Sequence, residues 1–200
     1  LSSLLGSNTQ EQTKNLLWAT GIDVDDDDND NNTSERRTDL MGDPLHSKPL
    51  VLSYGKDDIR ILLGTNHGFM HMFKDSGTTV AESWAFMPQE LMKNIPALRR
   101  NQNGDPKVYG VDGTPVAYFR DLNNDGIITN GDKVWLFFGL RRGGSSYYAL
   151  DITNPDDPKL MWHIDSNTSG FAELAQSWSK PVITFLKNNG DKPVLAFGAG

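Results

Sequence analysis

One segment has the residue types and the spacing of a calcium loop. Within residues 121–132, oxygen-bearing side chains alternate at Asp121, Asn123 and Asp125. Calcium binds six to eight oxygen atoms, and EF-hand loops supply them from positions 1, 3 and 5, with a glycine at position 6 and a backbone carbonyl at position 7. Gly126 and Ile127 occupy those last two positions. The segment therefore predicts a calcium site, in which Gly126 allows the sharp turn and the Ile127 carbonyl points inward.

The end of this segment departs from the EF-hand pattern. Position 9 is Thr129, whose hydroxyl group would coordinate directly or through water, and position 12 is Asp132 in place of the usual glutamate. The shorter carboxylate favours monodentate binding, so both departures predict weaker affinity for calcium. The alternative is a hairpin without a metal, because Asn, Asp and Gly are also good turn formers.

A second segment is acidic without having a complete loop pattern. Residues 23–30 contain six carboxylates, which account for most of the net charge of −7. Asp23, Asp25 and Asp27 lie at alternate positions, but no glycine closes a compact loop. We therefore predict a solvated, mobile tether with no buried contacts in preference to a second metal site. Arg36 and Arg37 follow it and partly neutralise it.

Other kinds of chemistry find little support. The chain has no cysteine, which excludes disulfides, zinc ribbons, thiol nucleophiles and iron–sulfur clusters. His67 and His71 lie in a strand pattern, so the helical zinc spacing does not apply to them, and His46 is expected to have a hydrogen-bonded structural role. Residues 143–146 (GGSS) predict a hairpin turn, because a nucleophile elbow needs a different setting. The acidic balance argues against nucleic acid as a partner, and we expect no enzyme activity.

The elements that must position the calcium loop are mostly strands. From residue 43 onward, short runs rich in β-branched and aromatic residues alternate with Gly, Pro, Asn and Asp, which is typical of all-β proteins. The predicted strands are residues 49–54, 59–64, 68–73, 80–86, 115–120, 133–139, 146–151, 159–164, 181–186 and 193–198.

Two helical segments accompany these strands. Residues 9–18 predict a helix with Thr9 as N-cap, ended by Gly21. Residues 89–100 predict a helical excursion broken by Pro96. No segment is long and apolar enough to span a membrane.

The predicted strands form repeats. SKPLVLSYG at Ser47, GTPVAYFRD at Gly113 and SKPVITFLK at Ser179 align, and each is followed by a strand that ends in glycine. Units of four short antiparallel strands are typical of propeller blades, because a single such sheet cannot cover both of its faces. Trp84, Trp135, Trp162 and Trp178 are then expected to pack between blades.

The predicted fold is therefore an all-β, modified β-propeller with quinoprotein-like blades. Residues 1–42 form an N-terminal helix and acidic loop leading into it, and residues 43–200 form about two and a half blades of an excerpt from a longer protein. The alternative is a β-sandwich. The calcium loop joins the first two strands of the second unit, where the other units have short turns.

Several motifs resemble those of one family. GDPLHSKP, GTNHGFMHMF and GLRRGGSSYYALD are similar to the C-terminal propeller of PilC/PilY-type type IV pilus biogenesis and tip-adhesin proteins, and the resemblance covers nearly all of residues 21–200. It implies an exported bacterial protein at the cell surface, pilus tip or outer membrane. It also implies pilins and minor pilins as partners, together with host-surface ligands.

The same resemblance implies a role for calcium as the bound cofactor. In this family, a D-x-N/D-x-D loop controls pilus extension against retraction, and with it twitching motility and adhesion. Its ligands fall on Asp121, Asn123, Asp125 and the Ile127 carbonyl, whereas its ninth-position carboxylate falls on Thr129. No Arg-Gly-Asp tripeptide is present, so host binding by that route is not implied.

Two other functions stay open. Ala149-Leu150-Asp151 with Trp162 fits the blade repeat of pyrroloquinoline-quinone dehydrogenases. Those enzymes need a central cofactor site with ligands from several blades, often with a vicinal cysteine pair, and this chain has no cysteine. A generic extracellular binding propeller is the other alternative.

Overall fold

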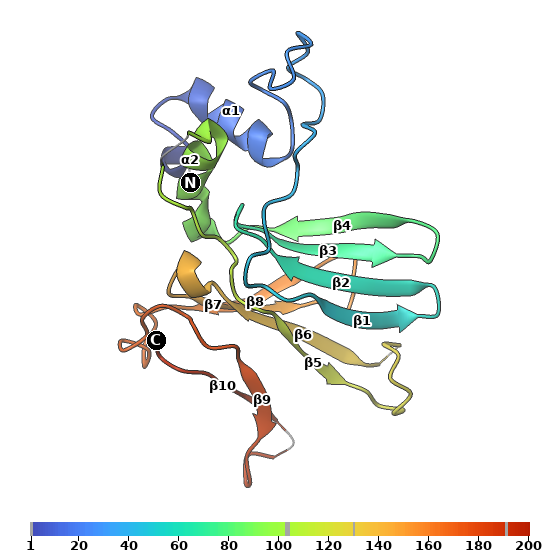
Figure 1. The fold of residues 1–200 in the computed structure, drawn as a ribbon. Coiled ribbons are helices and arrows are strands. Elements are labelled where there is room, and N and C mark those ends of the chain that lie inside the picture. Colours follow the sequence, from blue (N-terminus) through green and yellow to red (C-terminus); the bar gives the residue numbers. More distant parts are fainter. Residues whose placement is uncertain (1, 103–104, 130, 191) are drawn as a thin grey trace.

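The computed structural model describes residues 2–102, 105–129, 131–190 and 192–200, and their strands form three antiparallel sheets (Figure 1). The first sheet has the order β1-β2-β3-β4, the second β5-β6-β7-β8, and the third pairs β9 with β10. Each sheet follows the order of the chain, so each is a meander joined by tight connections. This is the arrangement predicted for consecutive propeller blades.

All ten predicted strands are present, with boundaries that differ by at most two residues. The first sheet contains β1 (Leu50–Gly55), β2 (Asp58–Gly64), β3 (Met70–Asp75) and β4 (Val80–Phe86). The second contains β5 (Val116–Arg120), β6 (Lys133–Gly139), β7 (Tyr147–Asp151) and β8 (Lys159–Ile164). The third contains β9 (Val182–Phe185) and β10 (Pro193–Ala196).

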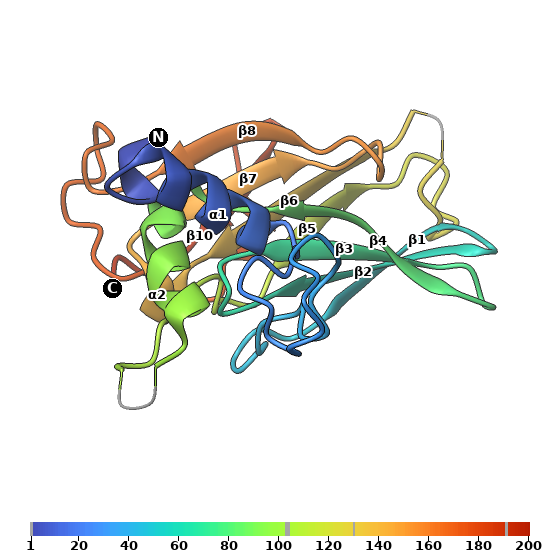
Figure 2. The same ribbon diagram turned by 90° about the horizontal axis from the view of Figure 1, so that it is seen from above.

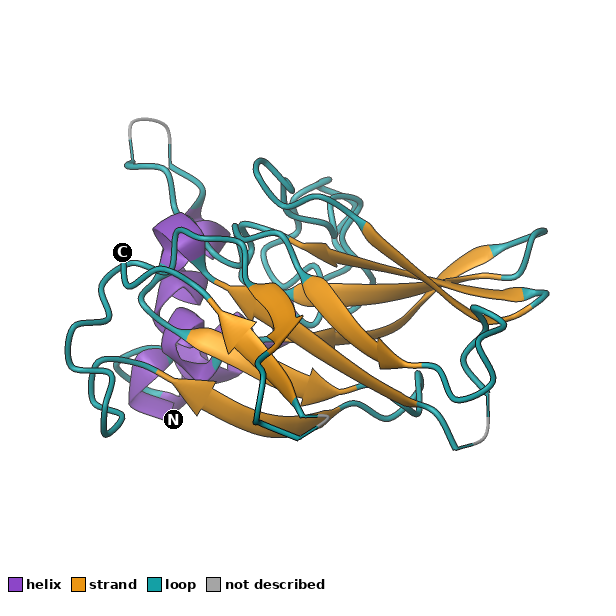
Figure 3. Ribbon diagram, turned by 90° about the horizontal axis from the view of Figure 1, so that it is seen from below, coloured by secondary structure: helices purple, strands orange, loops and turns teal. Residues whose placement is uncertain are grey.

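The helices lie together at one end of the strands (Figures 1 and 3). They are η1 (Ser2–Leu4), α1 (Thr9–Ala19), η2 (Gln89–Asn94), α2 (Ile95–Arg100) and the single turn η3 (Arg141–Gly143) between β6 and β7. None of the helices in the described part of the chain has the length and apolar character needed to cross a membrane.

Two details of these helices correct the sequence-based prediction. Asn8, and not Thr9, caps α1, because its Oδ1 accepts the amide of Glu11 at 3.0 Å while its backbone is extended. The predicted helical segment at residues 89–100 is divided into η2 and α2, and Pro96 lies in the first turn of α2, where its missing N–H needs no partner, so the break falls just before the proline. Gly21, with a φ of +93°, follows the end of α1 as predicted.

The first two sheets pack face to face and enclose the main core (Figures 1 and 2). The first sheet contributes Leu62, Met70 and Met72, and the second contributes buried residues of β6 and β7. In β7 the first four residues are all buried, whereas β4 is mostly exposed. The inner strands β6 and β7 of the second sheet are thus covered on both faces, which explains their continuous apolar runs.

The aligned repeats occupy equivalent places in the three sheets. The Ser47 hydroxyl accepts the amide of Gly64 at 3.0 Å, and the Ser179 hydroxyl accepts the amide of Gly198 at 2.8 Å. The second unit has Gly113 where the others have serine. An added Cβ there would lie 2.1 Å from the carbonyl oxygen of Gly139, so only glycine fits. The repeats predicted from the sequence are therefore structural repeats.

Polar contacts join the first two sheets at the end remote from the helices. The indole N–H of Trp84 donates to the carbonyl of Pro155 at 2.8 Å, as expected for a tryptophan between blades. Arg60 is only 1 % exposed and pairs with Asp58 and, at 2.7 Å, with Asp156 of the second unit. Burial alone would lower the pKa of Arg60, but these carboxylates raise it.

The N-terminal segment has a small core of its own. Leu5, Trp18 and Val24 are buried against Ile95 of α2, and Met87 contacts both this cluster and the main core. Residues 1–42 are therefore packed onto the connection between the first two sheets. The domain boundary at residue 42 stays a prediction.

Candidate calcium site

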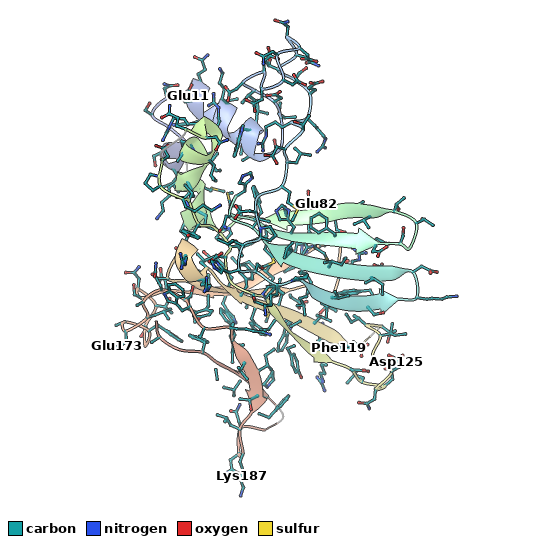
Figure 4. All side chains as sticks on the ribbon, viewed as in Figure 1. Glu11, Glu82, Phe119, Asp125, Glu173 and Lys187 are labelled. Carbon is teal, nitrogen blue, oxygen red and sulfur yellow. The ribbon has the colours of Figure 1, made fainter. Side chains whose placement is uncertain are left out.

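The predicted calcium loop connects β5 and β6 and lies at the end of the sheets opposite the helices. Figure 4 shows Asp125 at this end, far from Glu11 of α1. The β1–β2 and β3–β4 turns of the first sheet lie at the same end (Figure 1). Position 130 of the loop lies outside the described residues.

Asp121 organises the first half of the loop. Its carboxylate accepts the amide of Asn124 at 2.7 Å and the amide of Gly126 at 2.8 Å. Asn124 and Gly126 have φ values of +57° and +76°. A Cβ on Gly126 would meet nothing within 4 Å, so glycine is favoured there for its left-handed backbone and not for space.

Asn123 and Asp125 lie on the exposed side of this turn. One oxygen of Asp125 accepts the amide of Ile127 at 2.8 Å, and the other accepts the side-chain amide of Asn123 at 2.9 Å. The three residues at positions 1, 3 and 5 are thus turned onto the loop by its own N–H groups. Hydrogen bonds within the loop thus fix the orientation of these side chains.

Asp132 braces the second half of the loop. It is buried, and its two oxygens accept the amide of Leu122 at 3.0 Å and the amide of Thr129 at 2.7 Å. These amides lower the pKa of Asp132. The hydroxyl of Thr129 also donates to it at 3.1 Å and keeps its lone pairs available. Asp132 therefore closes the loop, and its coordination of calcium stays a prediction.

Ile128 anchors the loop on the neighbouring sheet. Its amide donates to the carbonyl of Ser53 in β1 at 2.8 Å, and its side chain belongs to the main core. No contact with the neighbouring sheet was expected for this residue. Its signal in the sequence is a second large apolar side chain directly after Ile127 in a mostly polar loop.

The donor set fits calcium. It offers two or three carboxylates, an amide oxygen, a backbone carbonyl and a hydroxyl, all of them oxygen atoms, which is the chemistry that a hard cation requires. No nitrogen or sulfur ligand of the kind preferred by zinc or copper belongs to the predicted set. Residues Asp121, Asn123, Asp125, Ile127 and Thr129 would hold the ion.

The acidic segment differs from its prediction. Asp23 is buried, and both of its oxygens accept the amide of Asp27 at 3.0 Å. Asp25 forms two hydrogen bonds with the guanidinium of Arg99 in α2, at 2.6 and 2.7 Å. The prediction of a tether without buried contacts is therefore wrong, because α2 supplies a cation that the local sequence does not contain.

The rest of the acidic segment repeats the backbone pattern of the 121–132 loop. Asp26 accepts the amide of Asn31 at 3.1 Å, five residues further on, as Asp121 does with Gly126. Asn29 and Asn31 both have a positive φ, so asparagine takes the place of glycine. Carboxylate oxygens of three residues lie within 4.8 Å of one another, namely Asp26, Asp28 and Asp30. This proximity alone does not identify an ion site, because exposed acidic groups often lie together without one.

The comparison with known proteins identifies the family. The family model described as the PilY1 beta-propeller domain matches residues 52–199. The chain belongs to this family. It is 29 % identical over 190 residues to the type IV pilus biogenesis factor PilY1 of Pseudomonas aeruginosa strain UCBPP-PA14, covering 82 % of this chain and 16 % of that protein. It is also 27 % identical over 141 residues to a PilY1 homolog of Xylella fastidiosa, covering 69 % of this chain and 9 % of that protein.

A solved structure is similar as well. The crystal structure of the Pseudomonas aeruginosa PilY1 C-terminal domain shares 30 % identity with this chain, with a TM-score of 0.48 over 71 % of this chain and 25 % of that one. The chain thus spans a small part of the PilY1 proteins that it matches. With the family established, the propeller is preferred to the sandwich.

The histidines of this PilY1-type chain have structural partners. Nδ1 of His46 lies 2.8 Å from the carboxylate of Asp112, whose side chain is fully buried and also accepts from Arg141 at 3.2 Å. His71 lies on β3, and its Nδ1 lies 2.6 Å from the carboxylate of Glu82 on β4. The structural role predicted for His46 is confirmed.

The structure also places the predicted turn at residues 143–146 and the tryptophans of this PilY1-type chain. Residues 143–146 connect η3 to β7, as expected for a turn. Trp135 and Trp162 line an apolar pocket against β10, between the second and third sheets. Trp178 is 43 % exposed and lies under two guanidinium groups, those of Arg141 at 4.7 Å and Arg142 at 5.6 Å. Trp178, which precedes the third sheet, thus contacts η3 of the second sheet, and its place between blades stays a prediction.

Proposed function

We propose that this chain is a calcium-responsive part of the propeller of a type IV pilus biogenesis protein. The observation that carries the proposal is the preorganised loop at residues 121–132, in which Asp121 is already turned onto the amides of Asn124 and Gly126. Membership of the PilY1 beta-propeller family supports the connection to pilus biogenesis. Bound calcium would supply a positive charge that holds the loop carboxylates together.

The loop side chains would divide the work. Asp121 and Asp125 provide charge, and Asn123 and Thr129 provide neutral oxygens. Asp132 holds the two ends of the loop together through the amides of Leu122 and Thr129. Because only two of these ligands carry charge and Asp132 serves mainly to hold the loop, we expect modest affinity for calcium, with a dissociation constant of roughly 10⁻⁶ to 10⁻³ M.

The anchor at Ile128 supports a regulatory role. Because Ile128 contacts Ser53 and the shared core, a change in the order of the loop acts on the contact between the first two sheets. In this proposal, calcium binding favours pilus extension over retraction and supports twitching motility and surface adhesion. The partners are then pilins and minor pilins, and the protein is exported to the bacterial surface or pilus tip.

Binding, and not catalysis, is the proposed activity of the propeller. The alternative is a quinoprotein-like dehydrogenase, favoured only by the blade repeat at residues 149–162. Reconstitution with pyrroloquinoline quinone separates the two. A quinone absorbance band that stays with the protein through gel filtration would favour the enzyme.

Calcium titration by calorimetry tests the site itself. We expect saturable binding by the wild type, and the Asp125→Ala variant should bind one ion fewer. Asp57→Ala is the matched control, because Asp57 is exposed in the β1–β2 turn at the same end of the sheets. Unchanged stoichiometry in Asp125→Ala would refute the site.

The cellular role has its own test. Cells that carry Asp125→Ala should export the protein normally and lose surface pili or twitching, whereas Asp57→Ala cells should behave as wild type. If the variant no longer binds calcium but the cells still twitch normally, the calcium site would be supported and its proposed role in regulating the pilus would be refuted.

A further inference from the structure

A large polar hollow lies at the helical end of the molecule, opposite the calcium loop. Its volume is about 1100 Å³, and its lining comes from α1, the segment after the acidic loop, η2, α2, the segment before β5, and η3. Residues of the N-terminal segment (1–42) and of η3 in the second sheet therefore line the same hollow. Figure 2 shows the helices gathered over this end of the sheets.

Arg37 lies on the wall of this hollow. It is only 9 % exposed, and its guanidinium lies 4.0 Å from the ring centroid of Trp18. One of its terminal nitrogens donates to the carbonyl of Trp18 at 3.2 Å. Its Nε–H is buried and has no hydrogen-bond partner among the described residues. Because an unpaired buried donor is costly, this N–H points to an acceptor that the described chain does not supply.

Arg142 contributes a second stacked guanidinium from the other side. It lies 5.2 Å from the ring of Tyr109, and its Nη1 donates to the Tyr109 hydroxyl at 2.9 Å. Arg142 is exposed and belongs to η3 of the second sheet. Both arginines are thus held over an aromatic face by one hydrogen bond each. The remaining N–H groups lie in the guanidinium planes.

The lining is rich in cations for a chain of net charge −7. It contains six basic residues and four carboxylates. Arg99 and Lys107 are neutralised by ion pairs with Asp25 and Asp43. Within the described residues, four cations of the lining make no ion pair, namely Arg37, Lys93, Arg100 and Arg142.

Stacked guanidinium groups suit carboxylates in particular. Stacking covers the faces of the guanidinium and leaves its in-plane fork, which matches the two oxygens of a planar carboxylate. The other charges in the lining restrict the class of ligand further. Asp27, Asp39 and Asp105 also face the hollow, so a densely charged polyanion would be repelled, whereas they would accept N–H groups of a peptide backbone.

We propose that this hollow binds an acidic peptide segment of a partner protein, with carboxylates at Arg37 and Arg142. The peptide satisfies the unpaired Nε–H of Arg37 and connects the N-terminal segment to the second sheet. The proposal is independent of calcium, because the loop at residues 121–132 lies at the opposite end of the strands.

Fluorescence anisotropy at low salt tests this proposal. The probe is a fluorescein-labelled Gly-Glu-Gly-Glu-Gly peptide with an amidated C-terminus, compared with the matched Gly-Gln-Gly-Gln-Gly peptide. We expect the glutamate peptide to bind at least tenfold more tightly. Arg142→Ala should weaken its binding about tenfold, since one charge-assisted hydrogen-bonded pair is lost.

Three further variants separate recognition from folding. Arg37→Lys keeps the charge but removes the fork, and it should also weaken binding about tenfold, with its melting temperature measured alongside so that any loss of stability is told from a loss of recognition. Arg36→Ala and Arg120→Ala are controls, because both residues are exposed and neither lines the hollow. They should bind the peptide as the wild type does.

Three results would overturn the proposal. The first is equal binding of the glutamate and glutamine peptides. The second is an effect of Arg36→Ala as large as that of Arg142→Ala. The third is that a heparin-derived hexasaccharide binds in an Arg142-dependent way while the glutamate peptide does not, which would assign the hollow to a polyanionic sugar.

Discussion

Two loops of this molecule share a backbone pattern and differ in what holds them. In both, an aspartate accepts the amide five residues further on, and a left-handed residue occupies the sixth position, Gly126 in one and Asn31 in the other. The 121–132 loop is braced from within by Asp132 and anchored to β1. The acidic loop is held from outside, by Arg99 of α2. Residue spacing thus sets the shape of a loop, and its anchor decides which part of the molecule it affects.

The largest effect is expected from removing the internal brace. Asp132→Ala leaves the amides of Leu122 and Thr129 without an acceptor, so the melting temperature should fall by roughly 4–8 °C even in chelator. Calcium affinity should fall with it, because the loop ends separate. Differential scanning calorimetry with and without calcium measures both effects.

The same brace predicts a dependence on acid. The pKa of Asp132 is lowered by the amides of Leu122 and Thr129, so its contribution is complete above its ordinary value of 3.8 and is lost as the pH falls through the lower folded value. Asp132→Asn should therefore reduce the loss of stability below that pH. An identical acid profile for variant and wild type would mean that Asp132 is not the brace.

Next in size is the loss of the ion alone. Asp125 is exposed and contacts only loop atoms, so Asp125→Ala should leave the calcium-free melting temperature unchanged. In calcium it should lose the ligand stabilisation, which is about 2.7 kcal/mol at a hundredfold excess over the dissociation constant. A variant that unfolds at room temperature would show that the loop and the blades are not separable.

The external anchor should give a smaller and more local effect. Arg99→Ala removes two hydrogen bonds to Asp25 and contacts with Glu11 and Asn15, and it should destabilise the protein by about 1–2 kcal/mol. Hydrogen exchange should rise in α1 and in the acidic loop, and not in residues 121–132. Arg100→Ala, one position along the same helix, should change little. Equal protection of both loops would remove the distinction between them.

The smallest effect concerns the sixth position of each loop. Gly126→Asn should destabilise by about 0.5 kcal/mol, because asparagine tolerates a left-handed backbone better than other side chains do. Asn31→Gly should be neutral or slightly stabilising for the same reason. Urea denaturation measures the free energy of unfolding of each variant. A large decrease in that free energy for Gly126→Asn would mean that the two positions are not equivalent.

Local patterns predicted most of the strands. Pro49, Pro115 and Pro181 each precede a strand, and close backbone contacts require the glycines that end the next strand in the first two units, Gly64 and Gly139. Capping was misplaced by one residue because Asn8 and Thr9 are both good N-cap types. These features depend on neighbouring residues, so the sequence carries them directly.

The missed features depend on contacts across the chain. The acidic segment was interpreted as a tether because it lacks glycine, although Asn31 adopts the required backbone conformation and Arg99 supplies the anchor from a distant helix. The contacts of Trp178 with Arg141 and Arg142 join segments that are distant in the sequence, so local patterns did not show them. The proposed calcium ligands could be named from spacing, whereas the bond from Ile128 to Ser53 could not.

That bond also determines how the molecule carries mechanical load. β1 is the edge strand of its sheet, and the Ile128 amide takes one of its free carbonyls while the Ile128 side chain enters the shared core. A force that separates the two sheets at this end must therefore break a hydrogen bond and expose an apolar side chain together. Stiffening the loop makes that rupture more cooperative, so this hairpin adds to the resistance that the contacts of Trp84 and Arg60 give to the same seam.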